Sequence, residues 1–137
     1  MSHIEQWKHN RRLIPQLPSD FPDWIVTVTF YTALHIVDAL LAFDRVEGIN
    51  RHDARNSVLL KTNKYLAIRR AYMPLYSLSR TVRYLADPAK WISTEMIEPK
   101  VFGYLYAVEN SAQKLMRKDL KSEKITLSSK IKSDAIE

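Results

Sequence analysis

The sequence predicts an all-α protein, arranged as a four- to five-helix up-and-down bundle. Glycine is scarce, since the 137 residues contain only Gly48 and Gly103, and the tight turns that join alternating strands usually require it. Apolar residues in the long segments instead recur every three or four positions, which is the period of an amphipathic helix. Mostly short connections between such segments favour an up-and-down arrangement.

Prolines and capping residues delimit the first two predicted helices. Residues 3–14 have helical spacing, and two prolines follow them. Ser19 or Asp20 can cap a second helix that has Pro22 in its first turn and ends near residue 43. The core-facing stripe predicted for this helix contains Trp24, Val28, Tyr31, His35, Asp38 and Leu41 or Ala42.

Three further helical segments follow. Asn50 is the predicted N-cap of a helix in "NRHDARNSVLL". Residues 63–85 keep helical register, although Pro74 should kink or split that helix because it lacks a backbone donor. Ser93 or Thr94 can cap a final helix with a clean amphipathic stripe, which is Val101, Phe102, Leu105, Val108, Ala112 and Leu115.

The sequence predicts one helical-bundle domain over residues 1–120 and a basic C-terminal extension over residues 121–137. Seven basic and two acidic residues lie between Lys114 and Lys132, which accounts for five of the six net positive charges. We expect the extension to be solvated, although "KITLSSKIK" alternates enough to form a short strand. Attraction to an anionic partner would come from this end or from local arginine clusters.

Composition excludes several classes of protein. The chain has no cysteine, which removes disulfides and cysteine-based metal sites. No apolar run approaches the roughly 18–20 residues that span a bilayer, so we expect a cytoplasmic protein with no membrane partner. Metal sites in helical bundles use Glu-x-x-His patterns with further carboxylates, and "HIVD" supplies only one half of such a pattern. We therefore predict no metal and no cofactor.

The first candidate site lies on the second predicted helix. Tyr31, His35 and Asp38 share one side of that helix at spacings of four and three residues. A histidine beside a carboxylate can act in acid–base chemistry. The same arrangement also satisfies a buried histidine in a core, and the structural interpretation is the one we favour.

A second candidate site is "INRHDARN", where Arg51, His52 and Arg55 surround a predicted helix N-terminus. Free amide groups and the helix dipole attract anions at such an end, so these side chains can form a phosphate site. The alternative is solvated charge beside a loop.

The third candidate site is a stripe in "YMPLYSLSRTVRYL" and the residues before it, where arginines alternate with tyrosines at helical spacing. Such a stripe can stack unpaired bases and hold phosphates. Alternatively the tyrosines belong to the core and one or two of the arginines pair with Asp38 or another buried acid. The stripe contains Arg69, Tyr72, Tyr76, Arg80 and Arg83.

Three segments in this order, "DWIVTVTFYTALHIVDALLA", "RHDAR" and "YSLSRTVRYL", resemble the HEPN superfamily, and most closely an uncharacterised HEPN-like branch. The superfamily contains small helical bundles of bacterial toxins and defence systems and of RNA- or nucleotide-associated proteins. The resemblance implies a bundle that forms a homodimer with a groove at the interface. Its ribonucleases carry an Arg followed closely by a His in a late helix, but this chain has no histidine after His52. The only formal fit runs from Arg45 to His52, across a predicted loop.

Two functional hypotheses follow. In the first, the protein engages RNA or a nucleotide and is a metal-independent endoribonuclease of a toxin or defence system. His52, Arg55 and His35 are then the catalytic candidates, and the RNA- or phosphate-binding candidates are Arg51, Tyr76, Arg80 and Arg83. In the second, it is a non-catalytic protein-interaction module of a toxin–antitoxin or defence pair, and Tyr31 and Asp38 belong to a buried polar network. Exposure of the basic groups around one cleft favours the first hypothesis, and their burial with paired donors favours the second.

Overall fold

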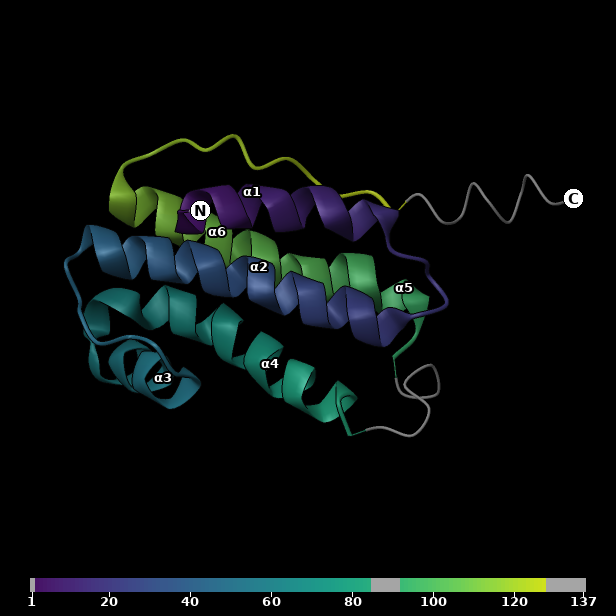
Figure 1. Ribbon diagram of the computed structural model, residues 1–137, viewed down its shortest axis with the longest axis horizontal. Helices are drawn as coiled ribbons and strands as arrows, with labels where there is room; N and C mark the ends of the chain where they lie inside the picture. Colours follow the sequence, from purple (N-terminus) through teal and green to yellow (C-terminus); the bar gives the residue numbers. More distant parts are fainter. Residues whose placement is uncertain (1, 85–91, 128–137) are drawn as a thin grey trace, which may run out of the picture.

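Four long helices alternate in direction and pack side by side, with a shorter helix across one end (Figure 1). This computed structural model describes residues 2–84 and 92–127. The described residues contain helices and no strand, which confirms the predicted all-α bundle. The long helices are α1 (His3–Leu13), α2 (Pro22–Phe43), α4 (Leu66–Val82) and α6 (Phe102–Met116), and the short one is α3 (His52–Lys61).

Helix α2 is the centre of the bundle, because it packs against α1, α4 and α6. Phe30, Ile36 and Leu40 are completely buried along it. By length and composition alone α2 could cross a membrane, contrary to the sequence-based expectation that no segment could. However, 72% of its most apolar window is buried inside the protein, as in the core helix of a soluble protein.

The buried face of α2 is rotated from the predicted one. Trp24 is 58% exposed, so it was wrongly assigned to the core. Of the two alternatives at the end of the stripe, Leu41 is buried and Ala42 is exposed. The stripe that contains Tyr31 and His35 lies at the border between the core and the surface, where both side chains are half-buried. This border position leaves polar groups of α2 within reach of neighbouring helices.

Several helix ends differ from the predictions. Helix α2 begins directly at Pro22 after Phe21, and α3 begins after Arg51, in both cases without a side-chain cap. The predicted caps Ser19, Asp20 and Asn50 are therefore wrong. A proline in the first turn needs no partner for the amide hydrogen that it lacks, and this reduces the need for a cap on α2.

Two prolines lie inside helical segments and have different effects. Helix α4 follows the short 3₁₀ turn η2 (Asn63–Tyr65) and continues through Pro74 without being split, because packing against α2 and α6 holds it. The last helical segment starts at Thr94 with α5 (Thr94–Met96) and then widens into the π-turn η4 (Ile97–Val101) before α6. Pro99 lies in this π-turn and cannot donate to the preceding turn.

Residues 121–127 pack on the bundle and run back along α1 (Figure 1). Ile125 and Leu127 are buried, and the Ile125 amide donates to Tyr106 Oη over 2.8 Å. This stretch is therefore not the solvated tail that its composition suggests, and it forms no strand. Residues 128–137, including the rest of "KITLSSKIK", lie outside the described residues.

A buried carboxylate joins α1 to α6. Glu109 is completely buried, and its Oε2 accepts from Trp7 Nε1 at 2.7 Å and from Arg11 Nε at 2.6 Å. Arg11 also donates to Glu109 Oε1 at 2.9 Å and to the Glu123 carbonyl at 2.7 Å. Each partner of this buried charge is thus satisfied, and the network connects α1, α6 and the C-terminal stretch.

Candidate functional site

A buried ion pair links α2 to α3. Arg55 donates from Nε to Asp38 Oδ1 at 2.7 Å and from Nη2 to Asp38 Oδ2 at 2.8 Å. The side chains are only 6% and 8% exposed. Burial alone would lower the pKa of Arg55, but the bond to Asp38 outweighs it and the net pKa is raised. One interpretation of the stripe on α4 paired an arginine of that stripe with Asp38 or another buried acid. The partner of Asp38 is instead Arg55 of α3.

This pairing gives Arg55 a positioning role. Arg55 is 5% exposed and its guanidinium is paired with Asp38, so it is not available to bind the phosphate of a ligand. Its remaining nitrogen, Nη1, lies 3.5 Å from Nδ1 of His52. Arg55 therefore connects the buried Asp38 carboxylate to a histidine nearer the surface.

His52 lies among aromatic rings from two other helices. Its ring centroid is 5.8 Å from that of Phe30, 5.6 Å from that of Tyr76 and 6.4 Å from that of Tyr31. Burial lowers the pKa of His52, and the positive charges of Arg55 and then Arg83 lower it further. The imidazole is consequently neutral at pH 7 and can accept a proton.

Two arginines of α4 and its C-terminal end approach the same histidine, each held by a tyrosine. Arg83 Nη2 donates to Tyr31 Oη at 3.1 Å, and Arg80 Nη1 donates to Tyr76 Oη at 3.3 Å. The Arg80 guanidinium also lies 5.7 Å from the centroid of the Tyr76 ring. Both arginines are exposed, and neither forms an ion pair with an acidic residue in the described ranges 2–84 and 92–127. We call these five residues the Arg–Tyr cluster: Tyr31, His52, Tyr76, Arg80 and Arg83.

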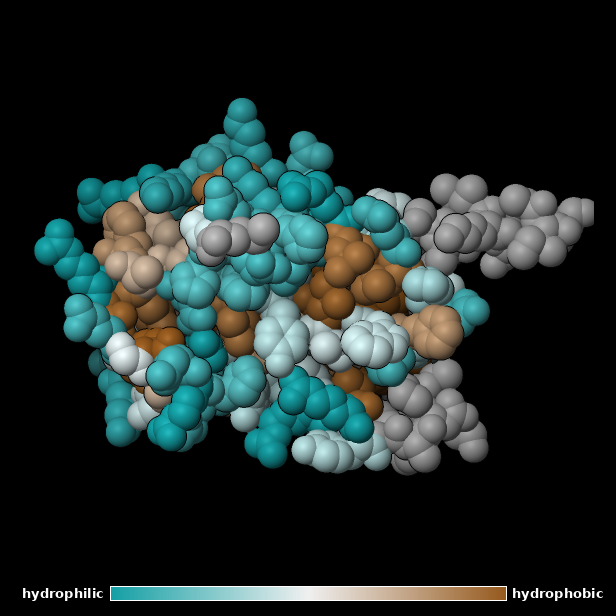
Figure 2. Space-filling model, viewed as in Figure 1, coloured by the Kyte–Doolittle hydropathy of each residue, from teal (hydrophilic) through white to brown (hydrophobic). Residues whose placement is uncertain are grey.

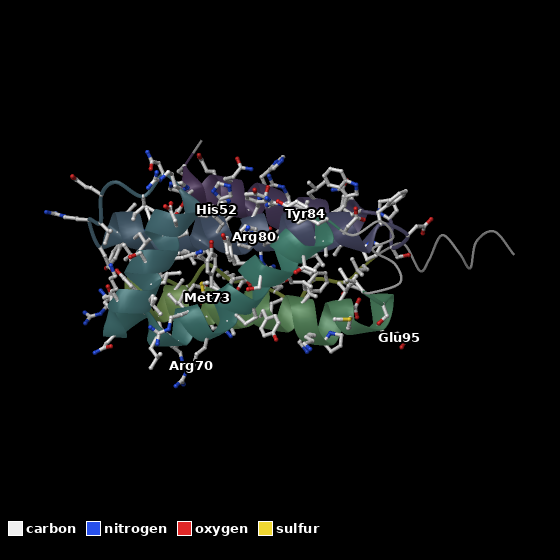
Figure 3. The ribbon with its side chains drawn as sticks, turned by 90° about the horizontal axis from the view of Figure 1, so that it is seen from below. His52, Arg70, Met73, Arg80, Tyr84 and Glu95 are labelled. Atoms are coloured by element: carbon white, nitrogen blue, oxygen red, sulfur yellow. The ribbon has the colours of Figure 1, made fainter. Side chains whose placement is uncertain are left out.

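Tyr76 also lines a pocket between α3 and α4. The pocket has a volume of about 340 Å³ and is lined by Asp53, Asn56, Ser57, Leu60, Arg69, Met73 and Tyr76. The buried Oδ1 of Asn56 has no hydrogen-bond partner among the described residues. Figure 3 shows His52 and Arg80 near each other, with Met73 between them and Arg70, and with Glu95 at the other end of the molecule. The cluster and the pocket therefore adjoin through one tyrosine ring.

His35 is not part of the cluster. Its Nδ1 lies 3.3 Å from Nδ1 of His3 on α1, and the two ring centroids are 5.5 Å apart. Burial is the main reason that its pKa is lowered, and His3 contributes next. His3 was not among the predicted site residues. The capping box of Ser2 and Glu5 places His3 at the start of α1, but this local pattern does not indicate that His3 meets His35.

The other predicted arginines serve local structure. Arg51 is exposed and pairs with Asp53 at 3.2 Å across side chains that are 71% and 73% exposed, which contributes little to stability. Arg69 donates to the Leu60 carbonyl at 2.6 Å and satisfies the end of α3. Arg69 lines the pocket that adjoins the Arg–Tyr cluster, and neither arginine is a member of the cluster itself.

The fold and the site define a class of protein: an all-α bundle in which a buried ion pair supports a basic and aromatic cluster. Comparisons with models of known protein families, with curated proteins and with solved structures gave no match. The HEPN relationship therefore stays a prediction that rests on the sequence resemblance.

Proposed function

We propose that this protein is a HEPN-like bundle that binds RNA or a nucleotide at the Arg–Tyr cluster. The observation that carries the proposal is the pair Arg80 and Arg83, which are exposed, lack a described acidic partner and are each oriented by a tyrosine hydroxyl. A planar guanidinium group can form bidentate hydrogen bonds to two phosphate oxygens. Fixing their orientation before binding reduces the entropy that a phosphate ligand must overcome.

The neighbouring pocket suits the base of the same ligand. Its volume of about 340 Å³ falls within the range of small-molecule sites, and Leu60, Met73 and Tyr76 give it apolar and aromatic walls. Asn56 and Ser57 add polar side chains to the same walls, which can hydrogen-bond the edge of a base. A nucleotide would then place its base beside Tyr76 and its phosphate on the arginines.

The catalytic form of this proposal is metal-independent RNA cleavage. Neutral His52 accepts the proton of a ribose 2′-hydroxyl, and the 2′-oxygen attacks the adjacent phosphorus. The bond from phosphorus to the 5′-oxygen breaks, the 5′-oxygen takes a proton from water, and a 2′,3′-cyclic phosphate remains. Arg80 and Arg83 stabilise the negative charge that develops on the phosphate. The Arg55 guanidinium lies beside His52, with Nη1 3.5 Å from Nδ1, and its positive charge helps to keep the imidazole neutral. At 3.5 Å it makes no firm hydrogen bond to Nδ1, so a ring nitrogen stays free to accept the proton. Such an activity would suit a toxin or defence protein in the cytoplasm.

The alternative is a non-catalytic interaction module, as a homodimer or as the partner of a toxin–antitoxin or defence protein. It is favoured by one observation, the burial of Arg55 in a closed bidentate pair with Asp38. In this case the network fixes the bundle, and the exposed arginines bind an acidic surface of a protein partner.

Binding of a labelled, mixed-sequence single-stranded RNA across a salt series tests the proposal. Affinity should fall as salt rises, and Arg80→Gln and Arg83→Gln should each weaken binding and reduce the salt slope by about 0.7. Arg70→Gln is the matched control, because Arg70 is exposed on the same helix but away from the cluster. Absence of binding at low salt, or equal effects of all three variants, would overturn the proposal.

Cleavage is tested on the same samples by gel electrophoresis in the presence of EDTA. Products that form with the native protein and disappear with His52→Ala support the catalytic form. Salt-dependent binding without products supports RNA or nucleotide binding alone, and a mononucleotide that displaces the RNA would identify the smaller ligand. The mass of the protein in solution, measured by light scattering, tests the expected homodimer.

A further inference from the structure

We propose that His3 and His35 form a site for a divalent transition-metal ion of the Zn²⁺ type, distinct from the Arg–Tyr cluster. The two residues are 32 positions apart in the sequence, on α1 and α2, and the fold brings their Nδ1 atoms to 3.3 Å. The sequence predicts no metal site, because it shows neither this pairing nor a metal-binding motif around either histidine.

The distance between the two nitrogens matches shared coordination. With Zn–N bonds of 2.0–2.1 Å and tetrahedral angles, two histidine nitrogens on one ion lie about 3.3–3.4 Å apart. The observed 3.3 Å is longer than a favourable hydrogen bond between ring nitrogens, which lies near 2.9–3.0 Å for N–H donors. One ion between the rings therefore explains the distance at least as well as a hydrogen bond does.

The chemistry of the two side chains also suits such an ion. Neutral imidazole binds Zn²⁺, Ni²⁺ and Cu²⁺, whereas Mg²⁺ and Ca²⁺ prefer oxygen ligands. His35 is half-buried on the central helix α2. Arg55 lies in the same region, but its charge is compensated by the bidentate pair with Asp38. His3 is exposed, which gives an ion access from solvent.

The site would have open coordination positions. No group of three or more His, Cys, Asp or Glu side chains is placed to hold a metal within residues 2–84 and 92–127. Among the side chains of these two ranges, the two imidazoles would be the ligands, and the other coordination positions would be open to water. Because His3 is the first residue of α1 and His35 lies within α2, a bound ion would fasten the start of α1 to the central helix.

Calorimetric titration of the untagged protein with Zn²⁺ and with Ni²⁺ tests the site. One ion per chain should bind to the native protein, and both His3→Ala and His35→Ala should lower the affinity at least tenfold. His9→Ala is the matched control, because His9 is also an exposed histidine of α1 and should bind like the native protein. At a Zn²⁺ concentration a hundred times the dissociation constant, the equilibrium constant for unfolding should fall about a hundredfold, and EDTA should reverse this change.

Two results would overturn the site. One is unchanged binding in His35→Ala when His3→Ala loses it, because the ion would then be held by the chain terminus and not between the helices. The other is equal binding of Mg²⁺. Because His3→Ala removes an exposed side chain, this variant should fold, and circular dichroism can verify that it does. The visible absorption of Co²⁺ bound to the native protein provides a second readout, since these bands should weaken when either histidine is replaced.

Discussion

Removing the Asp38 carboxylate should destabilise the bundle far more than removing an exposed acid of the same region. Asp38 and Arg55 share two hydrogen bonds of 2.7 and 2.8 Å, and their side chains are only 8% and 6% exposed. In Asp38→Ala the guanidinium stays buried without its counter-charge. Breaking a buried pair in this way costs about 3–5 kcal/mol, which is a large part of the roughly 5–15 kcal/mol that stabilises a typical domain.

The matched control is Asp53→Ala. Asp53, in the first turn of α3, pairs with Arg51 just before that helix, but the two side chains are 73% and 71% exposed. Loss of an exposed ion pair costs about 0–1 kcal/mol. A double variant, Asp38→Leu with Arg55→Met, should recover most of the stability lost in Asp38→Ala, because replacing both partners of a buried pair with apolar residues is often neutral.

Urea unfolding followed by circular dichroism measures all four proteins, the native chain included. The unfolding midpoint of Asp38→Ala should move to a much lower urea concentration than that of the native protein. The slope of the free energy of unfolding against urea should stay constant, which indicates a change of stability and not of the unfolded state. If Asp38→Ala costs no more than Asp53→Ala, the pair between α2 and α3 does not stabilise the bundle. If the double variant is less stable than Asp38→Ala, the contacts of Arg55 with groups other than Asp38, such as His52, stabilise the bundle substantially.

Three further predictions concern other parts of the structure. Glu109→Ala should cost about 3–5 kcal/mol in urea unfolding, because it leaves the mostly buried Arg11 uncompensated. Burial lowers the pKa of His35 and His52, so the unfolded chain binds more protons there. The free energy of unfolding should therefore fall as pH drops below about 6.5. This dependence on pH should be weaker in a variant lacking both histidines, and an unchanged dependence would contradict the lowered pKa values. Tyr31→Phe removes the hydroxyl that accepts from Arg83 and orients it. The affinity for labelled RNA should therefore fall several-fold, while the midpoint of urea unfolding stays nearly constant.

The helices could be predicted from the sequence because their signals are local. Apolar spacing located α1, α2, α4 and α6, and Pro22 marked the start of α2 correctly. The errors occurred where packing overrides local preference. Trp24 is exposed although it continues the apolar stripe of α2, and residues 121–127 pack on the bundle although their composition is that of a solvated tail. Neither outcome can be read from spacing alone.

The candidate site was predicted in part. Arg80, Arg83 and Tyr76 were chosen because arginines and tyrosines alternate on one predicted helix, and the structure brings them to His52. Pairings between helices were not accessible in this way. Which arginine meets Asp38 depends on how α3 crosses the end of the bundle, and that is set by tertiary packing. The buried Glu109 carries no local signal either, since a single acid on an apolar helix usually points to solvent.

The polar face of α2 shows how one helix can serve three purposes. Tyr31, His35 and Asp38 follow one another at spacings of four and three residues, and each meets a different part of the chain. Tyr31 accepts from Arg83 at the end of α4, His35 meets His3 of α1, and Asp38 holds Arg55 of α3. The face is therefore neither a single catalytic line nor only a satisfied interior. Its most buried member, Asp38, fixes the bundle, while the half-buried Tyr31 and His35 each support a separate surface, one suited to phosphate and the other to a metal ion. Replacing Asp38 should thus affect stability first, whereas replacing Tyr31 or His35 should affect one surface without the other.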